Sequence, residues 1–307
     1  MTNFPAGTQE PVNELVTVRD WLRYAVSRFN AAQLVYGHGT ATAYDEAAFL
    51  VLHTLHLPID QLDPWLDARV LAAERRALCN VIERRIATRK PAPYLTNEAW
   101  IGGHSFYVDE RVIVPRSYIG ELLDAGPAGV NSDPASVHRI LDLCTGSGCL
   151  AILAALAFPE AKVDASDISS GALAVAGRNV ADYGLQDRVE LIQSDLLDGL
   201  GNREPYDLIL ANPPYVSDRA VAAFPPEYAA EPVGAHAGGG DGLDIVRRIL
   251  KDARRHMSPE AMLVVEIGTG REILQSEYPD VEFLWLDTAG SQGEVLAVDR
   301  NALIEGM

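Results

Sequence analysis

The chain has few cysteines, no long apolar segment and a shortage of basic residues, and each of these excludes a class of protein. Three cysteines in 307 residues cannot build a disulfide framework, so a reducing compartment is the simplest expectation. No apolar run is long enough to span a membrane as a helix. The first 15 residues have no basic segment followed by an apolar one, which predicts no secretory signal. We therefore expect a cytoplasmic protein.

Acidic residues outnumber basic ones by 43 to 25, a formal net charge of −18. The imbalance is uneven, because residues 1–130 carry a net charge of −3 and residues 131–307 carry −15. So acidic a region repels a phosphate backbone, and we expect no direct sequence-specific binding of nucleic acid. It would attract a basic protein, although high acidity also serves solubility alone. Length and apolar content predict a globular chain of about two domains.

The first 90 residues predict a small helical domain. Apolar residues recur at helical spacing and predict helices over 17–35, 45–56 and 68–89. Thr17 is the expected N-cap of the first helix, and two glycines after residue 35 are expected to end it. The basic residues that close the third helix are typical of a solvated last turn: Arg84, Arg85, Arg89 and Lys90.

Residues 91–115 predict a linker and a β-hairpin, and the boundary between the domains is expected within them. Two prolines break the preceding helix, and alternating apolar residues then indicate two strands, with Val112 and Val114 on the second. The remaining residues, 116–307, form the expected catalytic domain.

Strands and helices alternate from residue 137 onward, which predicts an α/β fold with a seven-stranded, mostly parallel sheet. The loop between the last two strands is too short for a crossover helix, so these strands must pair antiparallel. The expected strands are 139–143, 162–165, 189–193, 208–211, 262–266, 281–286 and 295–298, and the expected helices are 117–125, 149–158, 171–183 and 243–256.

A glycine-rich turn joins the first of these strands to a helix, with the sequence DLCTGSGCLA over residues 142–151. Gly146 and Gly148 let the backbone approach a ligand closely and direct N–H groups at it. Asp142 ends the strand and can accept a hydrogen bond from an ammonium group, directly or through water. The same residues match the dinucleotide-binding pattern, and a Gly-x-Gly turn by itself is often only a tight turn.

An acidic residue also follows each of the next two strands. A carboxylate at Asp167 can accept both hydroxyls of a ribose, and one at Asp195 can accept the amine of an adenine, with Leu196 beside the ring. The carboxyl ends of parallel strands meet at one edge of a sheet, where open α/β sheets bind ligands. The spacing therefore predicts a nucleoside site at that edge.

The sequence Asn-Pro-Pro-Tyr follows the fourth strand directly, at residues 212–215. Proline has no N–H group and holds the preceding residue extended. The side-chain oxygen of Asn212 and the carbonyl of Pro213 can then each accept one hydrogen of a planar –NH2 group, with the ring of Tyr215 beside it. We predict that such a nitrogen is the reacting atom; the alternative is a simple turn that leaves a strand.

These residues resemble a class I S-adenosylmethionine-dependent methyltransferase that acts on an amide or amino nitrogen. Segments 94–100, 106–117 and 238–250 are similar to the HemK/PrmC-type glutamine N5-methyltransferases, and most to the PrmB branch. The resemblance implies a Rossmann-like fold and S-adenosylmethionine as methyl donor, with S-adenosylhomocysteine as product. It also implies a basic ribosomal protein as partner: the methyl group goes to a glutamine side-chain amide of large-subunit ribosomal protein L-three.

The resemblance also implies site residues and no metal. The implied catalytic residues are Asn212, Pro213, Pro214 and Tyr215. The implied cofactor contacts are Asp142, Thr145, Gly146, Gly148, Asp167, Ile168, Asp195, Leu196 and Asn212. The implied substrate contacts are Asn212, Pro213, Tyr215 and Arg116, and residues 1–90 are expected to recognise the substrate protein.

The chain departs from the family pattern at two places. Cys144 replaces the first glycine of the turn, which costs little if its φ is negative. The segment from Glu266 to Gly270 lacks an expected glutamine, which weakens any role for it. His236 is expected to be an ordinary loop residue and not a general base.

Three alternatives remain open at this point. An adenine N6-methyltransferase could use the same four residues, but the acidic catalytic half argues against it. A release-factor glutamine methyltransferase would share the whole site. A NAD(P)-binding protein or a non-catalytic nucleotide-binding factor would leave Asp195 and the Asn-Pro-Pro-Tyr sequence without a task.

Overall fold

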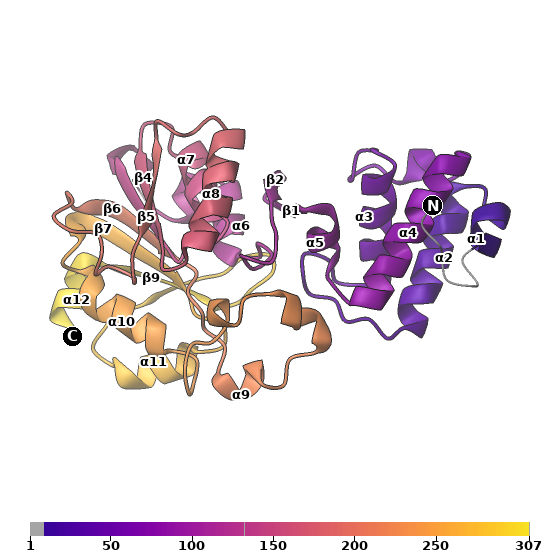
Figure 1. Ribbon diagram of the computed structural model, residues 1–307. Helices are drawn as coiled ribbons and strands as arrows, with labels where there is room; N and C mark the ends of the chain where they lie inside the picture. The colour runs from indigo at the N-terminus through magenta and orange to yellow at the C-terminus, as the bar shows by residue number, and fades with distance from the viewer. Residues whose placement is uncertain (1–8, 132, 307) are drawn as a thin grey trace. The chain divides into compact units, whose positions relative to one another are not determined.

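The structure is a computed structural model and describes residues 9–131 and 133–306 (Figure 1). Its contacts divide the chain into two compact units. The helical unit holds the residues up to Glu98 together with Pro225–Ala230, and the sheet unit holds the rest. The first division falls within residues 91–115, where the sequence analysis puts the boundary, whereas the return of the chain to the helical unit was not expected.

Among the described residues, no helix combines the length and the apolarity that crossing a membrane requires. The expectation about a secretory signal concerns the first 15 residues, of which 1–8 lie outside the described part of the chain.

The helical unit is built from α-helices whose apolar faces meet in one core. Its elements are α1 (Gln9–Glu14), α2 (Val18–Ala31), α3 (Ala43–Thr54), α4 (Ala72–Thr88) and α5 (Ala92–Thr96), with 3-10 turns at Asp63–Trp65 and Pro226–Ala230. Thr17 caps α2 as predicted: its hydroxyl accepts the Asp20 N–H, and the Asp20 carboxylate accepts the Thr17 N–H at 2.9 Å. The helix ends before the glycines, because the chain already turns at Gln33, where φ is 50°.

The basic end of α4 is only in part the solvated face that the sequence predicted, because Arg84 is exposed and Arg85 is not. The Arg85 side chain is fully buried, and its Nε donates to Glu46 Oε1 at 2.6 Å. Glu227, also fully buried, lies 2.6 Å from Nη2 of Arg89. A buried charge is costly to leave unpaired, so the ion pair between Glu227 and Arg89 makes Pro225–Ala230 an integral part of the helical unit.

The sheet unit contains the predicted seven-stranded sheet, in the order β5-β4-β3-β6-β7-β9-β8. Its strands are β3 (Arg139–Leu143), β4 (Lys162–Asp167), β5 (Val189–Gln193), β6 (Tyr206–Ala211), β7 (Met257–Glu266), β8 (Leu284–Leu286) and β9 (Val295–Asp299). Strands β3 to β7 pair parallel, and β9 pairs antiparallel with both β7 and β8. This is the class I topology predicted from the sequence, including the antiparallel final pair.

Helices cover both faces of this sheet (Figure 1). One face shares a core with α6 (Tyr118–Asp124), α7 (Cys149–Ala157) and α8 (Ser170–Asp182), and the other with α10 (Asp244–Ala253), α11 (Arg271–Glu277) and α12 (Arg300–Glu305). Shorter elements lie in loops: α9 (Asp218–Val221) and 3-10 turns at Pro127–Gly129, Pro134–Ser136 and Val233–Ala235. With both faces covered, the loops at the carboxyl ends of the strands remain as the edge for a ligand.

The predicted hairpin is present but lies earlier than expected. Strands β1 (Glu98–Ile101) and β2 (His104–Tyr107) pair with each other. The two glycines between them have φ of 55° and 70°, and positive φ at both central positions is what a tight type I′ turn requires. The prediction that Val112 and Val114 form the second strand is wrong, because both are buried in the loop that follows β2.

Candidate active site

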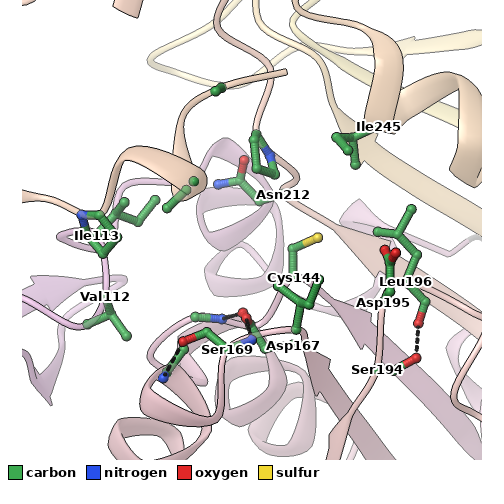
Figure 2. Close-up of a pocket in the computed structure, with 18 of the residues that line it drawn as sticks. Val112, Ile113, Cys144, Asp167, Ser169, Ser194, Asp195, Leu196, Asn212 and Ile245 are labelled. Carbon is green, nitrogen blue, oxygen red and sulfur yellow. Dashed lines mark hydrogen bonds between the residues drawn. The ribbon is translucent and has the colours of Figure 1, made fainter. Parts of the chain in front are cut away.

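A cavity of about 440 Å3 lies in the sheet unit, where loops leave the carboxyl ends of β3, β4, β5 and β6 (Figure 2). Its wall is completed by residues 111–113, residues 232–237 and α10. Seven of the site residues predicted from the sequence line it: Gly146, Asp167, Ile168, Asp195, Leu196, Asn212 and Pro214. The structure therefore brings together the strand-end acids and the start of the Asn-Pro-Pro-Tyr sequence.

The glycine turn after β3 is held from the helix behind it. Gly148 has φ of 80°, and a Cβ added there would lie 3.0 Å from the Cβ of Ala176 on α8. Asn179, also on α8, donates to the Ser147 carbonyl at 2.8 Å and exchanges hydrogen bonds with the backbone of Tyr107. Asn179 was not predicted from the sequence, since nothing in a helical pattern separates a buried asparagine from an exposed one.

Asp142 is fully buried and only half satisfied. Its Oδ2 accepts the Thr145 hydroxyl at 2.5 Å and the Ala151 N–H at 3.1 Å. Its Oδ1 has no hydrogen-bond partner among the described residues. Burial raises the pKa of Asp142 to about 7, against the opposing effect of the Thr145 hydrogen bond. Such an orphaned oxygen is a ready acceptor for an ammonium group or for a water bound to one.

Asp167 is oriented by two backbone groups. Its Oδ2 accepts the Gly146 N–H at 2.9 Å, and its Oδ1 accepts the Ser169 N–H at 2.8 Å. Each carboxylate oxygen has a further lone pair, so both can still accept a hydroxyl. The next residue, Ile168, is 67% exposed and gives the cavity wall an apolar surface beside the acid.

Asp195 has a cationic neighbour that the sequence analysis missed. Nη2 of Arg248, on α10, lies 3.0 Å from Asp195 Oδ1, and Arg248 lines the same cavity. The side chain of Asp195 is still 48% exposed, so its remaining lone pairs can accept an amine. Figure 2 shows Asp195 and Leu196 on the wall opposite Ile113.

Two residues on the cavity wall adopt a left-handed backbone without being glycine. Cys144 has φ of 58° and Leu196 has φ of 51°, and no other non-glycine residue described in the sheet unit has positive φ. The condition under which a cysteine at position 144 would cost little is therefore not met, since its φ is positive. Left-handed backbone costs an L-residue about 1–2 kcal/mol, and such strain concentrates at ligand sites.

Asn212 and Pro213 present two acceptors that nothing in the described protein uses. The Asn212 side chain lies on the cavity wall and makes no hydrogen bond to a described residue (Figure 2). No described group donates to the Pro213 carbonyl. The segment is held on both sides, by β6 before it and by a bridge between Val216 and Ala237 after it. Two fixed acceptors one residue apart suit a planar –NH2 group.

Six predicted residues do not line the cavity: Asp142, Thr145, Gly148, Pro213, Tyr215 and Arg116. Arg116 donates to both oxygens of Glu231, each at 2.8 Å, and its contact with substrate stays a prediction. Nε2 of His236 lies 2.9 Å from the same fully buried carboxylate. His236 is thus a buried loop residue, and Arg116 ties the loop around Glu231 to the segment before α6.

The comparisons with known proteins identify the family. Residues 130–224 match the family model described as the methyltransferase small domain. The ribosomal protein uL3 glutamine methyltransferase of Bordetella pertussis is 57% identical over 290 residues, which cover 94% of this chain and 97% of that protein. The proteins of the same name from Bradyrhizobium diazoefficiens and Neisseria gonorrhoeae are 57% and 52% identical, over 92% and 96% of this chain and 90% and 98% of theirs. The chain belongs to this family.

Membership of the uL3 glutamine methyltransferase family confirms the methyltransferase class predicted from the sequence and sets aside the NAD(P)-binding alternative. The crystal structure of the hMettl16 catalytic domain with an RNA hairpin aligns at 17% identity and a TM-score of 0.49, over 71% of this chain and 81% of that one. That likeness is too distant to carry an inference.

The cavity residues, together with Asp142 at the end of β3, fit S-adenosylmethionine as methyl donor. The orphaned Oδ1 of Asp142 matches an ammonium group, the free lone pairs of Asp167 match ribose hydroxyls, and Asp195 with Leu196 matches an adenine edge. Among the described residues no three side chains of His, Cys, Asp or Glu gather as metal ligands.

Proposed function

We propose that this chain transfers a methyl group from S-adenosylmethionine to the side-chain amide nitrogen of a glutamine in ribosomal protein uL3. The observation that carries the proposal is the pair of unused acceptors, Asn212 Oδ1 and the Pro213 carbonyl, beside a nucleoside-type cavity in a chain of this family. A glutamine side chain ends in a primary amide, whose two N–H groups match these acceptors one to one.

S-adenosylmethionine, when bound, supplies an electrophilic methyl group on a positively charged sulfur. The chain holds it through the groups that the site leaves free. Asp142 accepts from the ammonium group, Asp167 from the ribose hydroxyls and Asp195 from the exocyclic amine. Glycine at Gly146 keeps the turn free of a side chain where the backbone meets the ligand, and glycine at Gly148 lets the turn pack closely on α8.

The substrate amide needs positioning, because its nitrogen lone pair is delocalised and weakly nucleophilic. Asn212 and Pro213 accept both amide hydrogens and so fix the direction in which the nitrogen faces the cavity. Positioning of this kind removes several kcal/mol of barrier, up to about 7–11 kcal/mol in ideal cases. As positive charge develops on the nitrogen, its N–H groups become stronger donors and both hydrogen bonds strengthen. The proton then passes to water.

The helical unit is the proposed docking surface for the substrate protein. A glutamine side chain alone cannot identify one protein, so selection requires contacts away from the reacting atoms. The large apolar side chains exposed on this unit are Tyr44 and Leu71, at 51% and 68%. Replacing both by Asp should raise KM for uL3 and leave kcat/KM for a short glutamine peptide unchanged. An unchanged KM for uL3 would argue against docking at these residues.

Charge is proposed to steer the encounter. The net charge of −15 in residues 131–307 attracts a basic ribosomal protein, and attraction between exposed charges is screened by salt. The association rate of uL3 with the full-length enzyme should therefore fall as salt is raised. A rate independent of salt would contradict the steering. The cytoplasmic location expected from the sequence accords with a ribosomal substrate.

The decisive experiment is mass spectrometry of uL3 and of the release factors from a strain that lacks this gene. We expect one methyl group to be missing from a glutamine of uL3. The unaltered gene should restore it and Asn212→Ala should not, although that variant should still bind the cofactor. Loss from a release factor instead would support that alternative, and loss of an adenine methyl group from nucleic acid would support the other. Unchanged uL3 would contradict the proposal.

A further inference from the structure

Tyr215 closes the Asn-Pro-Pro-Tyr segment, and its side chain is held by the last residue of β7 and by the turn that follows it. The hydroxyl donates to Glu266 Oε1 at 2.8 Å. The ring packs over Gly268, where an added Cβ would lie 2.8 Å from ring atom Cδ2. Glu266 and Gly268 thus hold the phenol from two directions, although the sequence analysis assigned no role to this segment.

Glu266 is the last residue of β7, and its buried side chain accepts hydrogen bonds on both oxygens. Its Oε2 accepts the Ser117 hydroxyl at 2.7 Å and the Tyr118 N–H at 3.0 Å, so three donors surround two oxygens. Burial raises the pKa of Glu266, and the hydrogen bonds from Ser117 and Tyr215 oppose that shift. A carboxylate in this setting makes short, charge-assisted hydrogen bonds, which are more rigid than neutral ones.

The backbone of the same segment is also confined. A Cβ added at Gly238 would lie 2.6 Å from the Pro214 carbonyl oxygen, and one at Gly242 would collide with the carbonyl oxygen of Tyr215. The main chain that carries the Pro213 acceptor therefore has little room to shift. The hydrogen bond from Tyr215 to Glu266 holds the side chain of the same segment.

We propose that Glu266 is a positioning residue for methyl transfer: by anchoring Tyr215 it holds in place the segment whose Asn212 and Pro213 accept the two hydrogens of the substrate amide. The inference rests on the proposed function and adds to it a residue that touches neither substrate nor cofactor. It gives a reason for an acidic residue at the end of β7, although Glu266 does not line the cavity.

The test compares three variants of the full-length enzyme, Glu266→Ala, Glu266→Gln and Tyr215→Phe, with uL3 as substrate. We expect Glu266→Ala and Tyr215→Phe each to lower kcat at least about tenfold, since small displacements of a reacting group are costly. The Kd for S-adenosylhomocysteine should stay within about twofold. Glu266→Gln should recover part of kcat, because its carbonyl can serve Ser117 and Tyr118 while its –NH2 donates to the phenol oxygen.

Tyr206→Phe is the matched control, because the Tyr206 hydroxyl donates to Asp164 Oδ2 at 2.7 Å, a buried tyrosine–carboxylate pair at the opposite end of β6 from Asn212. It should lower thermal stability as Tyr215→Phe does and leave kcat unchanged. The double variant Glu266→Ala with Tyr215→Phe should be no slower than Glu266→Ala alone, because the hydrogen bond lost in Tyr215→Phe is already lost in Glu266→Ala.

The inference is overturned if the unaltered enzyme methylates uL3 and Glu266→Ala keeps kcat within about twofold of it, or if the losses of the two single variants multiply in the double variant. If Glu266→Ala does not fold, Tyr215→Phe removes the same hydrogen bond from the other side, and a normal kcat there overturns it equally. An unaltered enzyme without activity on uL3 would instead contradict the proposed function, and this inference with it.

Discussion

Cofactor affinity should depend on pH through Asp142, a fully buried carboxyl group beside the cavity whose pKa is raised by burial. Burial raises its pKa to about 7 in the folded protein, against about 3.9 for an unfolded chain. Between these values the native state keeps a proton that the unfolded state has lost, so the stability of the cofactor-free protein falls as pH rises through the window. A shift of this size corresponds to about 4 kcal/mol over the whole window.

The cofactor-free protein favours the protonated form of Asp142, whereas a bound ligand favours the ionised form, because its ammonium group lies beside Oδ1. With a pKa of about 7, roughly one-tenth of Asp142 is ionised at pH 6 and roughly nine-tenths at pH 8. Since only the ionised form pairs with the ammonium group, affinity for S-adenosylhomocysteine should fall about tenfold from pH 8 to pH 6, or about 1.4 kcal/mol.

The assay is titration calorimetry with S-adenosylhomocysteine near pH 6, 7 and 8, on the unaltered protein and on Asp142→Asn. In the variant, the amide oxygen can replace Oδ2 as acceptor from Thr145 and Ala151, while the –NH2 takes the place of the orphaned oxygen. Binding should therefore be weaker and nearly independent of pH. Equal affinity of the unaltered protein at pH 6 and 8, or an unchanged slope in the variant, would refute the reasoning.

Three further predictions concern single residues. Asp167→Ala should weaken binding of S-adenosylhomocysteine by about 1–3 kcal/mol, and calorimetry showing unchanged affinity would remove Asp167 from the site. Arg85→Met leaves the carboxylate of Glu46 buried without its cationic partner. It should therefore lower the unfolding free energy of the helical unit by about 3–5 kcal/mol in a denaturant titration. A loss below about 1 kcal/mol would show that the pair is dispensable. Cys144→Gly should raise stability by about 0.5–1 kcal/mol, the strain relieved less the entropy of glycine, and a lower thermal midpoint would contradict the strain.

The strands of the sheet could be predicted from the local pattern of apolar residues. Contacts between residues far apart in the sequence could not. Strands β3 and β5 begin and end at the predicted residues, because turn-bounded apolar runs of that length are typical of buried strands. Val112 and Val114 show the same alternation but are buried by loop packing. The docking of Glu227 on the helical unit depends on charges about 140–180 positions away in the sequence, which no local window contains.

The candidate site residues at strand ends could be predicted from the sequence, and those within helices could not. Asp142, Asp167 and Asp195 were found because topology brings the carboxyl ends of parallel strands together. Arg248 and Asn179 lie within helices, where spacing does not reveal which side faces a ligand. Glu266 carried the same strand-end signal as the three aspartates, and comparison with the family pattern set it aside although its position pointed to a role.

The cavity region concentrates features that a protein core normally avoids. Asp142 Oδ1 and the Pro213 carbonyl lack donors within the described protein, and Cys144 and Leu196 hold a left-handed backbone. An unsatisfied buried acceptor costs about 1–3 kcal/mol of folding free energy. Without a ligand, the apolar burial in the two hydrophobic cores of the sheet must offset this cost. A ligand that supplies the missing donors returns that free energy as affinity. Cofactor and substrate amide should therefore each raise the stability of the protein, the first by supplying a donor to Asp142 and the second by supplying one to the Pro213 carbonyl.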